Sequence, residues 1–148
     1  MKKICFFTPS LYIGGVEKIF LTYSESLIKL GYNVSYLTTH KQGDLSKDLP
    51  FGLNPVFLNS GKFRKSLFPI INYLRKNTPD VLITGGDIPN AVLILIIKCF
   101  KIKTNLIISQ HNYKNIERNH FISKNIIKFI YPHSNSILSV SSGIKEML

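Results

Sequence analysis

Ile4-Cys5-Phe6-Phe7-Thr8 is the stretch that decides the fold, because it is an apolar run followed by a turn and then a helical pattern. Continuous apolar runs of this length are typical of strands buried on both faces of a parallel sheet. Gly14 and Gly15 lie in the turn. From Val16 to Leu30, apolar side chains recur at helical spacing, and Gly31 is a natural terminator. The stretch therefore predicts the first half of a βαβ unit.

The same alternation continues along the rest of the sequence. Further strands are predicted at 33–39, 56–58, 81–84, 106–109 and 137–140, a polar loop at 40–55, and helices at 67–74 (ended by Pro79), 87–100 and 123–131 (closed by Pro132), with another beginning at 141–142. Alternating strands and helices predict a mainly parallel sheet, and right-handed crossovers place helices on both of its faces. The expected fold class is α/β, a Rossmann-like three-layer α/β/α arrangement.

Composition limits the classes of protein to consider. With 148 residues, 45% of them hydrophobic and 18% charged, the chain is one domain long and unlike a disordered segment. The longest apolar run, Ala91–Ile97, stops at Lys98, whereas a membrane-spanning helix needs ~20 residues. Cys5 and Cys99 both lie in apolar runs and are expected to be buried. No Cys/His spacing indicates zinc, and a reducing cytoplasm fits.

The chain is strongly basic. Nineteen Lys and Arg residues against eight Asp and Glu residues give a formal net charge of +11. A basic surface suits nucleic acid, an anionic membrane leaflet or phosphorylated ligands. The cations are scattered, and the excess of lysine over arginine fits a bias of genome composition equally well. No signature of a nucleic-acid-binding module is present, so nucleic acid is the weakest of these candidates and none is expected as a partner.

Several loops follow the predicted strands and carry polar or glycine residues. They contain Gly14-Gly15, Gly85-Gly86-Asp87, His111-Asn112 and Ser141-Ser142. Ligands of parallel sheets bind beyond the carboxyl ends of the strands. We therefore expect these loops to gather at one edge of the sheet.

Gly14 and Gly15 open the first helix and form the first candidate site. Glycines allow close approach of the backbone, and a helix start offers unpaired N–H groups for a phosphate or a sugar oxygen. The spacing matches neither the dinucleotide-binding fingerprint nor the P-loop. A strand-to-helix turn without a ligand fits the two glycines equally well. Glu17 in the first turn interacts favourably with the helix dipole by ~0.3–1 kcal/mol. It repels anions, which favours an uncharged sugar or acceptor nearby.

The other loops supply further candidates. His111 can donate to a sugar hydroxyl or stabilise developing charge, or it can simply cap a turn. Asp87 can bind a hydroxyl, although helix capping is its expected role. Ser141 is expected to cap a helix, since no G-x-S-x-G elbow surrounds it.

Six short motifs, in order, resemble the N-terminal part of glycosyltransferase family 4. They are Phe6-Phe7-Thr8-Pro9, Gly14-Gly15-Val16-Glu17-Lys18, Leu27-Ile28-Lys29-Leu30-Gly31-Tyr32-Asn33-Val34, Pro79-Asp80-Val81-Leu82-Ile83, Ile108-Ser109-Gln110-His111-Asn112 and Ile137-Leu138-Ser139-Val140-Ser141. The resemblance implies a GT-B architecture, in which two Rossmann-like domains face each other across a cleft. The N-terminal domain binds the acceptor, and the C-terminal domain binds the nucleotide sugar and carries an E-x7-E motif.

The sequence departs from the family in two places. It has no E-x7-E motif, because only two residues follow Glu146, and Gly85-Gly86-Asp87 stands where many members carry histidine or serine. Residues 1–148 are therefore expected to be the N-terminal half of a GT-B enzyme, without its donor-binding domain and inactive alone.

The resemblance also implies roles for individual residues. Gly14 and Gly15 would lie near the transferred sugar or the donor diphosphate, and His111 would lie at the reacting centre as the catalytic candidate. The remaining candidates for substrate binding are Glu17, Asp87, Asn112 and Ser141. The family transfers sugars with retention of configuration and uses no metal, and no cofactor is expected.

The expected function is transfer of a hexose from a nucleotide-sugar donor, held mainly by the missing domain, to a cell-surface glycan or lipid-linked acceptor. Such an enzyme of polysaccharide biosynthesis would work in the cytoplasm, peripherally on the inner face of the plasma membrane, with the anionic membrane surface as a further partner. The alternative is a non-catalytic binding subunit of a split glycosyltransferase, or a membrane-docking module.

Overall fold

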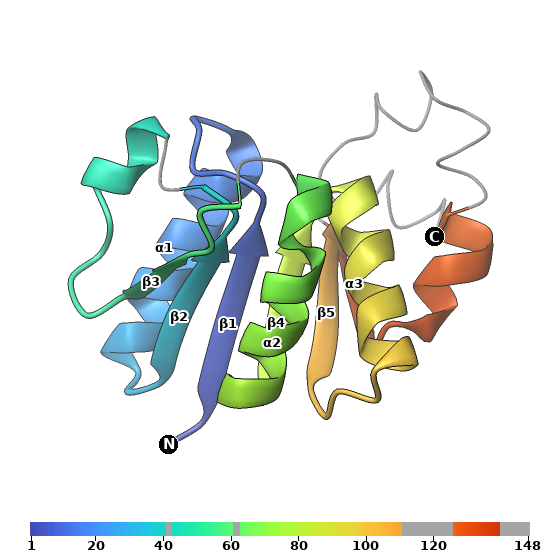
Figure 1. Ribbon diagram of the computed structural model, residues 1–148. Coiled ribbons are helices and arrows are strands. Elements are labelled where there is room, and N and C mark those ends of the chain that lie inside the picture. Colours follow the sequence, from blue (N-terminus) through green and yellow to red (C-terminus); the bar gives the residue numbers. More distant parts are fainter. Residues whose placement is uncertain (41–42, 61–62, 111–125, 140–148) are drawn as a thin grey trace.

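The computed structural model describes residues 1–40, 43–60, 63–110 and 126–139 (Figure 1). Within these residues, the strands pair in parallel in the order β3-β2-β1-β4-β5-β6. Their bounds are Lys3–Thr8 (β1), Asn33–Thr38 (β2), Asn54–Phe57 (β3), Val81–Gly85 (β4), Asn105–Gln110 (β5) and Ser136–Ser139 (β6). The predicted parallel sheet is confirmed. The strand order reverses between β1 and β4, which is where ligands of such sheets bind.

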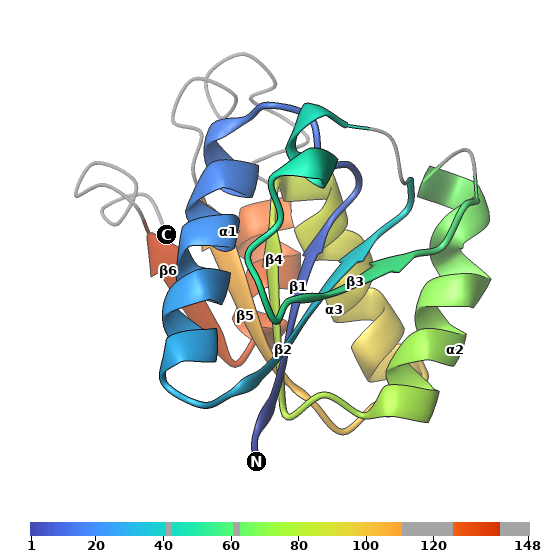
Figure 2. The same ribbon diagram turned by 90° about the vertical axis from the view of Figure 1, so that its left-hand side faces the viewer.

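Helices cover both faces of the sheet and make three layers. Helix α1 (Gly15–Lys29) lies on one face, whereas α2 (Leu67–Asn77) and α3 (Asp87–Cys99) lie on the other (Figure 2). Strand β1 shows why both faces must be covered. Phe6 packs in the apolar cluster with Phe20 of α1, whereas Phe7 packs in the other cluster with Ile94 of α3. The predicted Rossmann-like α/β/α class is confirmed.

Short helical turns connect some of these strands and helices, and several of them differ from the elements that the sequence predicts there. The predicted loop 40–55 contains the 3-10 turn η1 (Asp44–Lys47), and β3 begins at Asn54. Another 3-10 turn, η2 (Phe63–Ser66), precedes α2. In its described part, the predicted helix 123–131 is a π-helical turn, η3 (Ile126–Ile130), followed by the 3-10 turn η4 (Tyr131–His133). Pro132 explains the tight ending, because its ring lacks the N–H that an α-helix needs.

The two cysteines differ in their surroundings. Cys5 is fully buried in β1, as predicted. The prediction for Cys99 is wrong, because this residue ends α3 and is exposed. Its apolar neighbours in the sequence point to different sides of the helix. None of the described helices is both long and apolar enough to cross a bilayer.

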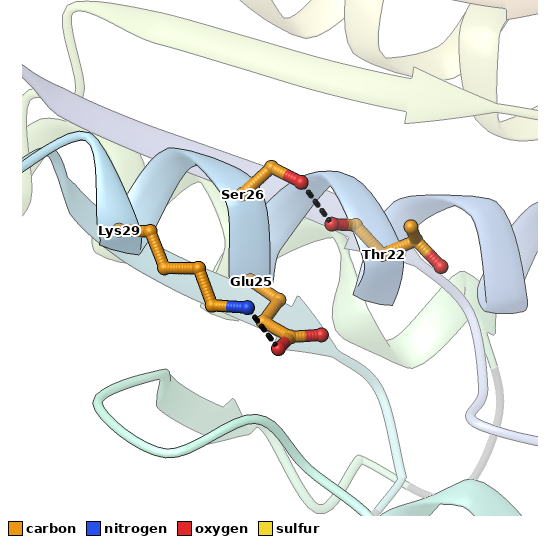
Figure 3. A network of polar contacts seen from close by, with 4 residues as sticks. All are labelled: Thr22, Glu25, Ser26 and Lys29. Atoms are coloured by element: carbon orange, nitrogen blue, oxygen red, sulfur yellow. Dashed lines mark hydrogen bonds and ion pairs between the residues drawn. The ribbon is translucent and has the colours of Figure 1, made fainter.

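The outer face of α1 carries several polar side chains, and the helix is balanced in charge. Lys29 Nζ donates to Glu25 Oε1 at 2.7 Å, and Ser26 Oγ donates to the Thr22 carbonyl at 3.0 Å (Figure 3). Exposed pairs four residues apart contribute about 0.3–0.5 kcal/mol. With Glu17 and Lys18, the helix carries two cations and two carboxylates. Helix α1 itself therefore has no surplus of positive charge.

Candidate functional site at the carboxyl edge of the sheet

The loop between β1 and α1 is held from two sides. The Pro9 carbonyl accepts hydrogen bonds from Thr39 N at 3.2 Å, Thr39 Oγ1 at 2.6 Å and Thr38 Oγ1 at 3.1 Å. Farther along, Leu45 N donates to the Leu11 carbonyl at 3.1 Å. Gly43 has a φ of +149°, and a Cβ there would collide with the Leu11 backbone. The end of β2 and the turn η1 thus fix the path of the chain toward Gly14.

Close packing brings the start of α1 against the end of β4. A Cβ atom at Gly85 would lie 2.6 Å from Val16 Cγ1 and 3.2 Å from Phe20 Cζ. Gly85 also pairs with Ser109 of β5. The first two predicted loops therefore leave the sheet at the same edge and next to each other, beside the end of β5. His111, Asn112 and Ser141 lie outside the described residues, so their place at this edge stays a prediction.

Gly14 and Gly15 begin α1 without a side-chain cap. Gly14 is the N-cap residue with an extended backbone (φ −146°, ψ 161°), and its carbonyl accepts from Lys18 N at 3.1 Å. Apart from its chain neighbours and the backbone of its own helix, no atom of the described residues lies within 4 Å of the place where a Cβ at Gly15 would stand. Neither the backbone conformation nor packing requires glycine at position 15. Open space on the Cβ side of Gly15 leaves room for a ligand to lie beside the backbone there.

Glu17 modifies the chemistry of this helix start. Its carboxylate folds back beside Gly14 and accepts a hydrogen bond from its own backbone amide. Half-burial raises the pKa of Glu17, and the hydrogen bond opposes the shift. The charge of Glu17 in turn adds to burial in raising the pKa of Tyr36, whose hydroxyl lies 3.0 Å from Thr8 Oγ1. With a carboxylate already at the helix start, the site suits hydroxyl groups better than a free anion.

The start of α3 holds a second polar cluster. Asp87 was predicted to cap this helix, and that is wrong: the N-cap residue is Gly86, at φ +96°, and Asp87 is the first helical residue. The Asp87 carboxylate instead accepts from the Tyr131 hydroxyl at 3.4 Å. The buried Asn90 Nδ2 donates to the Ser109 carbonyl at 3.3 Å and to the Tyr131 hydroxyl at 3.2 Å. Burial, followed by the Asp87 charge, raises the pKa of Tyr131 while Asn90 opposes the shift.

Sequence reasoning missed Asn90 and Tyr131. Asn90 lies in the predicted helix 87–100, directly before the apolar run Ala91–Ile97, and Tyr131 is 41 residues away from it in the sequence. The signal available was a lone amide side chain in an apolar helix, because a buried amide needs a partner. Together these residues tie the end of β5 to α3, directly before Gln110.

Two hollows lie at the opposite, amino edge of the sheet. The first, about 240 Å³, lies between α2 and the strands β1 to β3, and the second, about 490 Å³, lies beside the starts of β4 and β5. In the first, Tyr73 donates to Ser35 at 3.1 Å and Asn54 donates to Asn33 at 3.2 Å, so its polar wall is largely self-satisfied. No three His, Cys, Asp or Glu side chains among the described residues come together to hold a metal ion.

Comparisons with known proteins point to one family. Residues 13–148 match the model of Glycosyltransferase Family 4. No curated protein matches this chain at a significant level.

Similar solved structures are GT-B glycosyltransferases. The apo form of WaaB, a lipopolysaccharide outer core galactosyltransferase, is 18% identical with a TM-score of 0.63, over 99% of this chain and 41% of that one. Sucrose-phosphate synthase of Thermosynechococcus elongatus is 12% identical with a TM-score of 0.66, over 99% and 44%. MurG of Acinetobacter baumannii is 12% identical with a TM-score of 0.62, over 95% and 42%. At these identities the likeness shows the fold, and the chain spans about two-fifths of each of these proteins.

Proposed function

This chain belongs to glycosyltransferase family 4, and we propose that it forms the acceptor-side domain of an enzyme that transfers a hexose from a nucleotide sugar. One observation carries the proposal. The glycine-led start of α1 meets the end of β4 at the carboxyl edge of the sheet, and among the described residues no side chain fills the space where a Cβ of Gly15 would stand. The donor would be held mainly by a second domain.

In this proposal, the chain acts by positioning groups and by hydrogen bonding. The amides at the start of α1 lie near the transferred sugar or the departing diphosphate. Because the Glu17 carboxylate lies beside them, their preferred partners are the oxygen atoms of the sugar. His111 contacts the sugar at the reacting centre, and Glu17 and Asp87 supply oxygen atoms for hydroxyl groups. Asn112 and Ser141 complete the polar rim. Retention of configuration without a metal or another cofactor belongs to the same proposal.

The proposed acceptor is a cell-surface glycan or a lipid-linked sugar, and the proposed location is the cytoplasmic, inner face of the plasma membrane. The net charge of +11 supports contact with an anionic leaflet. WaaB, which has a similar fold, is described as a lipopolysaccharide outer core galactosyltransferase.

A second candidate is a binding subunit of a split glycosyltransferase. The share of the solved structures that this chain covers, 41% of WaaB and 42% of MurG, fits either candidate. The DNA downstream of the codon for Leu148 distinguishes the two candidates. An open reading frame that continues into a donor-binding domain supports one enzyme, and a separate gene for that domain supports a split one.

The experiment that tests the function compares turnover of nucleotide sugars by residues 1–148 alone and by the same residues joined to, or mixed with, the donor-binding domain. We expect turnover only in the second case. There, Gly15→Leu should abolish turnover by filling the open space, whereas the matched control Ser26→Leu on the outer face of α1 should keep it. His111→Ala should lower turnover at least tenfold, ~1.4 kcal/mol in barrier. Full activity of Gly15→Leu would refute the proposed site.

A further inference from the structure

We propose that the outer face of α2 and α3 rests on the surface of an anionic lipid bilayer. This inference rests on the peripheral location proposed above and assigns that contact to particular residues. The α2–α3 face comprises the exposed apolar side chains Phe68, Ile88, Leu95 and Phe100 and the cations Arg64, Lys65, Arg75, Lys76 and Lys98.

Apolar side chains are aligned along the outside of α3. Ile88 is 63% exposed and Leu95 is 52% exposed, and the exposed Cys99 continues the same stripe at helical spacing. On α2, Phe68 is 79% exposed. Several exposed apolar side chains on one face indicate an interaction surface. Helix α1 and its C-cap also expose Tyr23 and Leu30, so it is the charge of the two faces that distinguishes them.

The two helices form one continuous face. They lie side by side on the same side of the sheet (Figure 1). At their carboxyl ends, the Arg75 guanidinium lies 5.2 Å from the centre of the Phe100 ring. This pair joins a cation of α2 to an aromatic ring at the end of α3. The apolar and cationic groups of the two helices are therefore presented together.

The net charge of the α2–α3 face indicates which kind of partner it would bind. The turn η2 and the helices α2 and α3 carry five cations and one carboxylate, Asp87, which is only partly exposed and bonded to Tyr131. Helix α1, on the other side of the sheet, carries two cations and two carboxylates. Of these two faces, the α2–α3 face therefore carries the surplus of positive charge, and it also carries the apolar stripe of α3. A surface that complements it electrostatically is anionic.

A lipid bilayer can contact both the apolar side chains and the cations of this face. Exposed aromatic and aliphatic side chains enter the boundary between headgroups and acyl chains, while Lys and Arg pair with anionic lipids. Nucleic acid would use the cations and leave Ile88 and Leu95 without a role. Phe68 and Ile88 lie in the first turns of their helices, next to the carboxyl edge of the sheet. Docking on this face therefore brings the candidate site near the membrane, where a lipid-linked acceptor is found.

The first test is co-sedimentation of the 148-residue chain with vesicles of phosphatidylcholine and with vesicles that also contain phosphatidylglycerol. We expect binding to the anionic vesicles and loss of binding as salt screens the charges. Arg64→Gln with Lys65→Gln should weaken binding about tenfold. Ile88→Ser with Leu95→Ser should also weaken it severalfold. The matched controls on α1, Lys18→Gln with Lys29→Gln and Tyr23→Ser with Leu30→Ser, should leave it unchanged.

The second test reads the contact directly from the exposed thiol of Cys99. A bimane attached there should be quenched by brominated lipids when the chain binds anionic vesicles. The same probe at Ser26→Cys, in a chain that also carries Cys99→Ser, should not be quenched, because this position lies on the outer face of α1.

Each failure is informative. No binding to anionic vesicles, or equal quenching at both positions, overturns the proposed face. Binding that the apolar substitutions leave intact, and that nucleic acid competes away, assigns the face to nucleic acid and overturns the lipid proposal. Sugar transfer is measured separately in detergent without vesicles, so the loss of this inference leaves the proposed function standing.

Discussion

Gly85, the last residue of β4, lies directly against Val16 in the first turn of α1. The contact joins two loops that are 70 residues apart in the sequence and fixes the carboxyl edge of the sheet. A single absent methyl group makes this approach possible. The position of the candidate site therefore depends on the pair.

Gly85→Ala should destabilise the fold by about 1–3 kcal/mol, because the added Cβ would overlap Val16 Cγ1 in a well-packed region. Urea unfolding measures the change. Gly15→Ala is the matched control and should be neutral, since its Cβ would meet no atom within 4 Å. Adding Val16→Ala should recover much of the loss in Gly85→Ala. Equal stabilities of Gly85→Ala and the wild type would contradict the packing described.

Asn90→Ala should cost about 1–3 kcal/mol of stability, because the buried Ser109 carbonyl and Tyr131 hydroxyl each lose the amide as a donor. Asn72→Ala, at an exposed position of α2, should be neutral or slightly stabilising. Thermal unfolding of both variants tests the difference. If Asn90→Ala unfolds at the wild-type temperature, the cluster at the start of α3 has no energetic role.

Glu17→Gln should stabilise the protein at neutral pH. Burial raises the pKa of Glu17, so the folded chain holds its proton more tightly than the unfolded chain does, and ionisation at neutral pH opposes folding. The gain should shrink as pH falls through the raised pKa and vanish below 4.5, the ordinary value. Glu25→Gln should instead lose about 0.3–0.5 kcal/mol with its exposed pair to Lys29. Urea unfolding from pH 8 to pH 4 checks both; a loss of stability in Glu17→Gln at pH 7 would contradict the account.

Thiol reagents should distinguish the two cysteines. Burial raises the pKa of Cys5 to about 11, so this thiol stays protonated and shielded, whereas Cys99 is exposed. At pH 8 the folded protein should react rapidly at one thiol, and the protein in urea at two. Rapid reaction of two thiols without denaturant would show that β1 is not in the core.

The sequence was sufficient to predict the sheet and its layers, because apolar runs and helical spacing report local structure. Phe6 and Phe7 illustrate this, since both had to be buried and each faces a different helix layer. The prediction for Asp87 failed because its role depends on a contact between residues that are far apart in the sequence. The carboxylate of Asp87 accepts a hydrogen bond from Tyr131, 44 residues away, and no local pattern records that pairing. Cys99 was misjudged because an apolar run in a helix has an outer side as well as an inner one.

The most direct test of the central claim is the separation between residues 15 and 111, measured by pulsed electron resonance. Spin labels at Gly15→Cys and His111→Cys, in a chain with Cys99→Ser, should lie closer together than labels at Gly15→Cys and Lys103→Cys. Lys103 precedes β5 and His111 follows it, and six residues of strand span about 20 Å. A shorter 15–111 distance places both loops at one edge, as the account requires. A shorter 15–103 distance would put them at opposite ends of the sheet and contradict it.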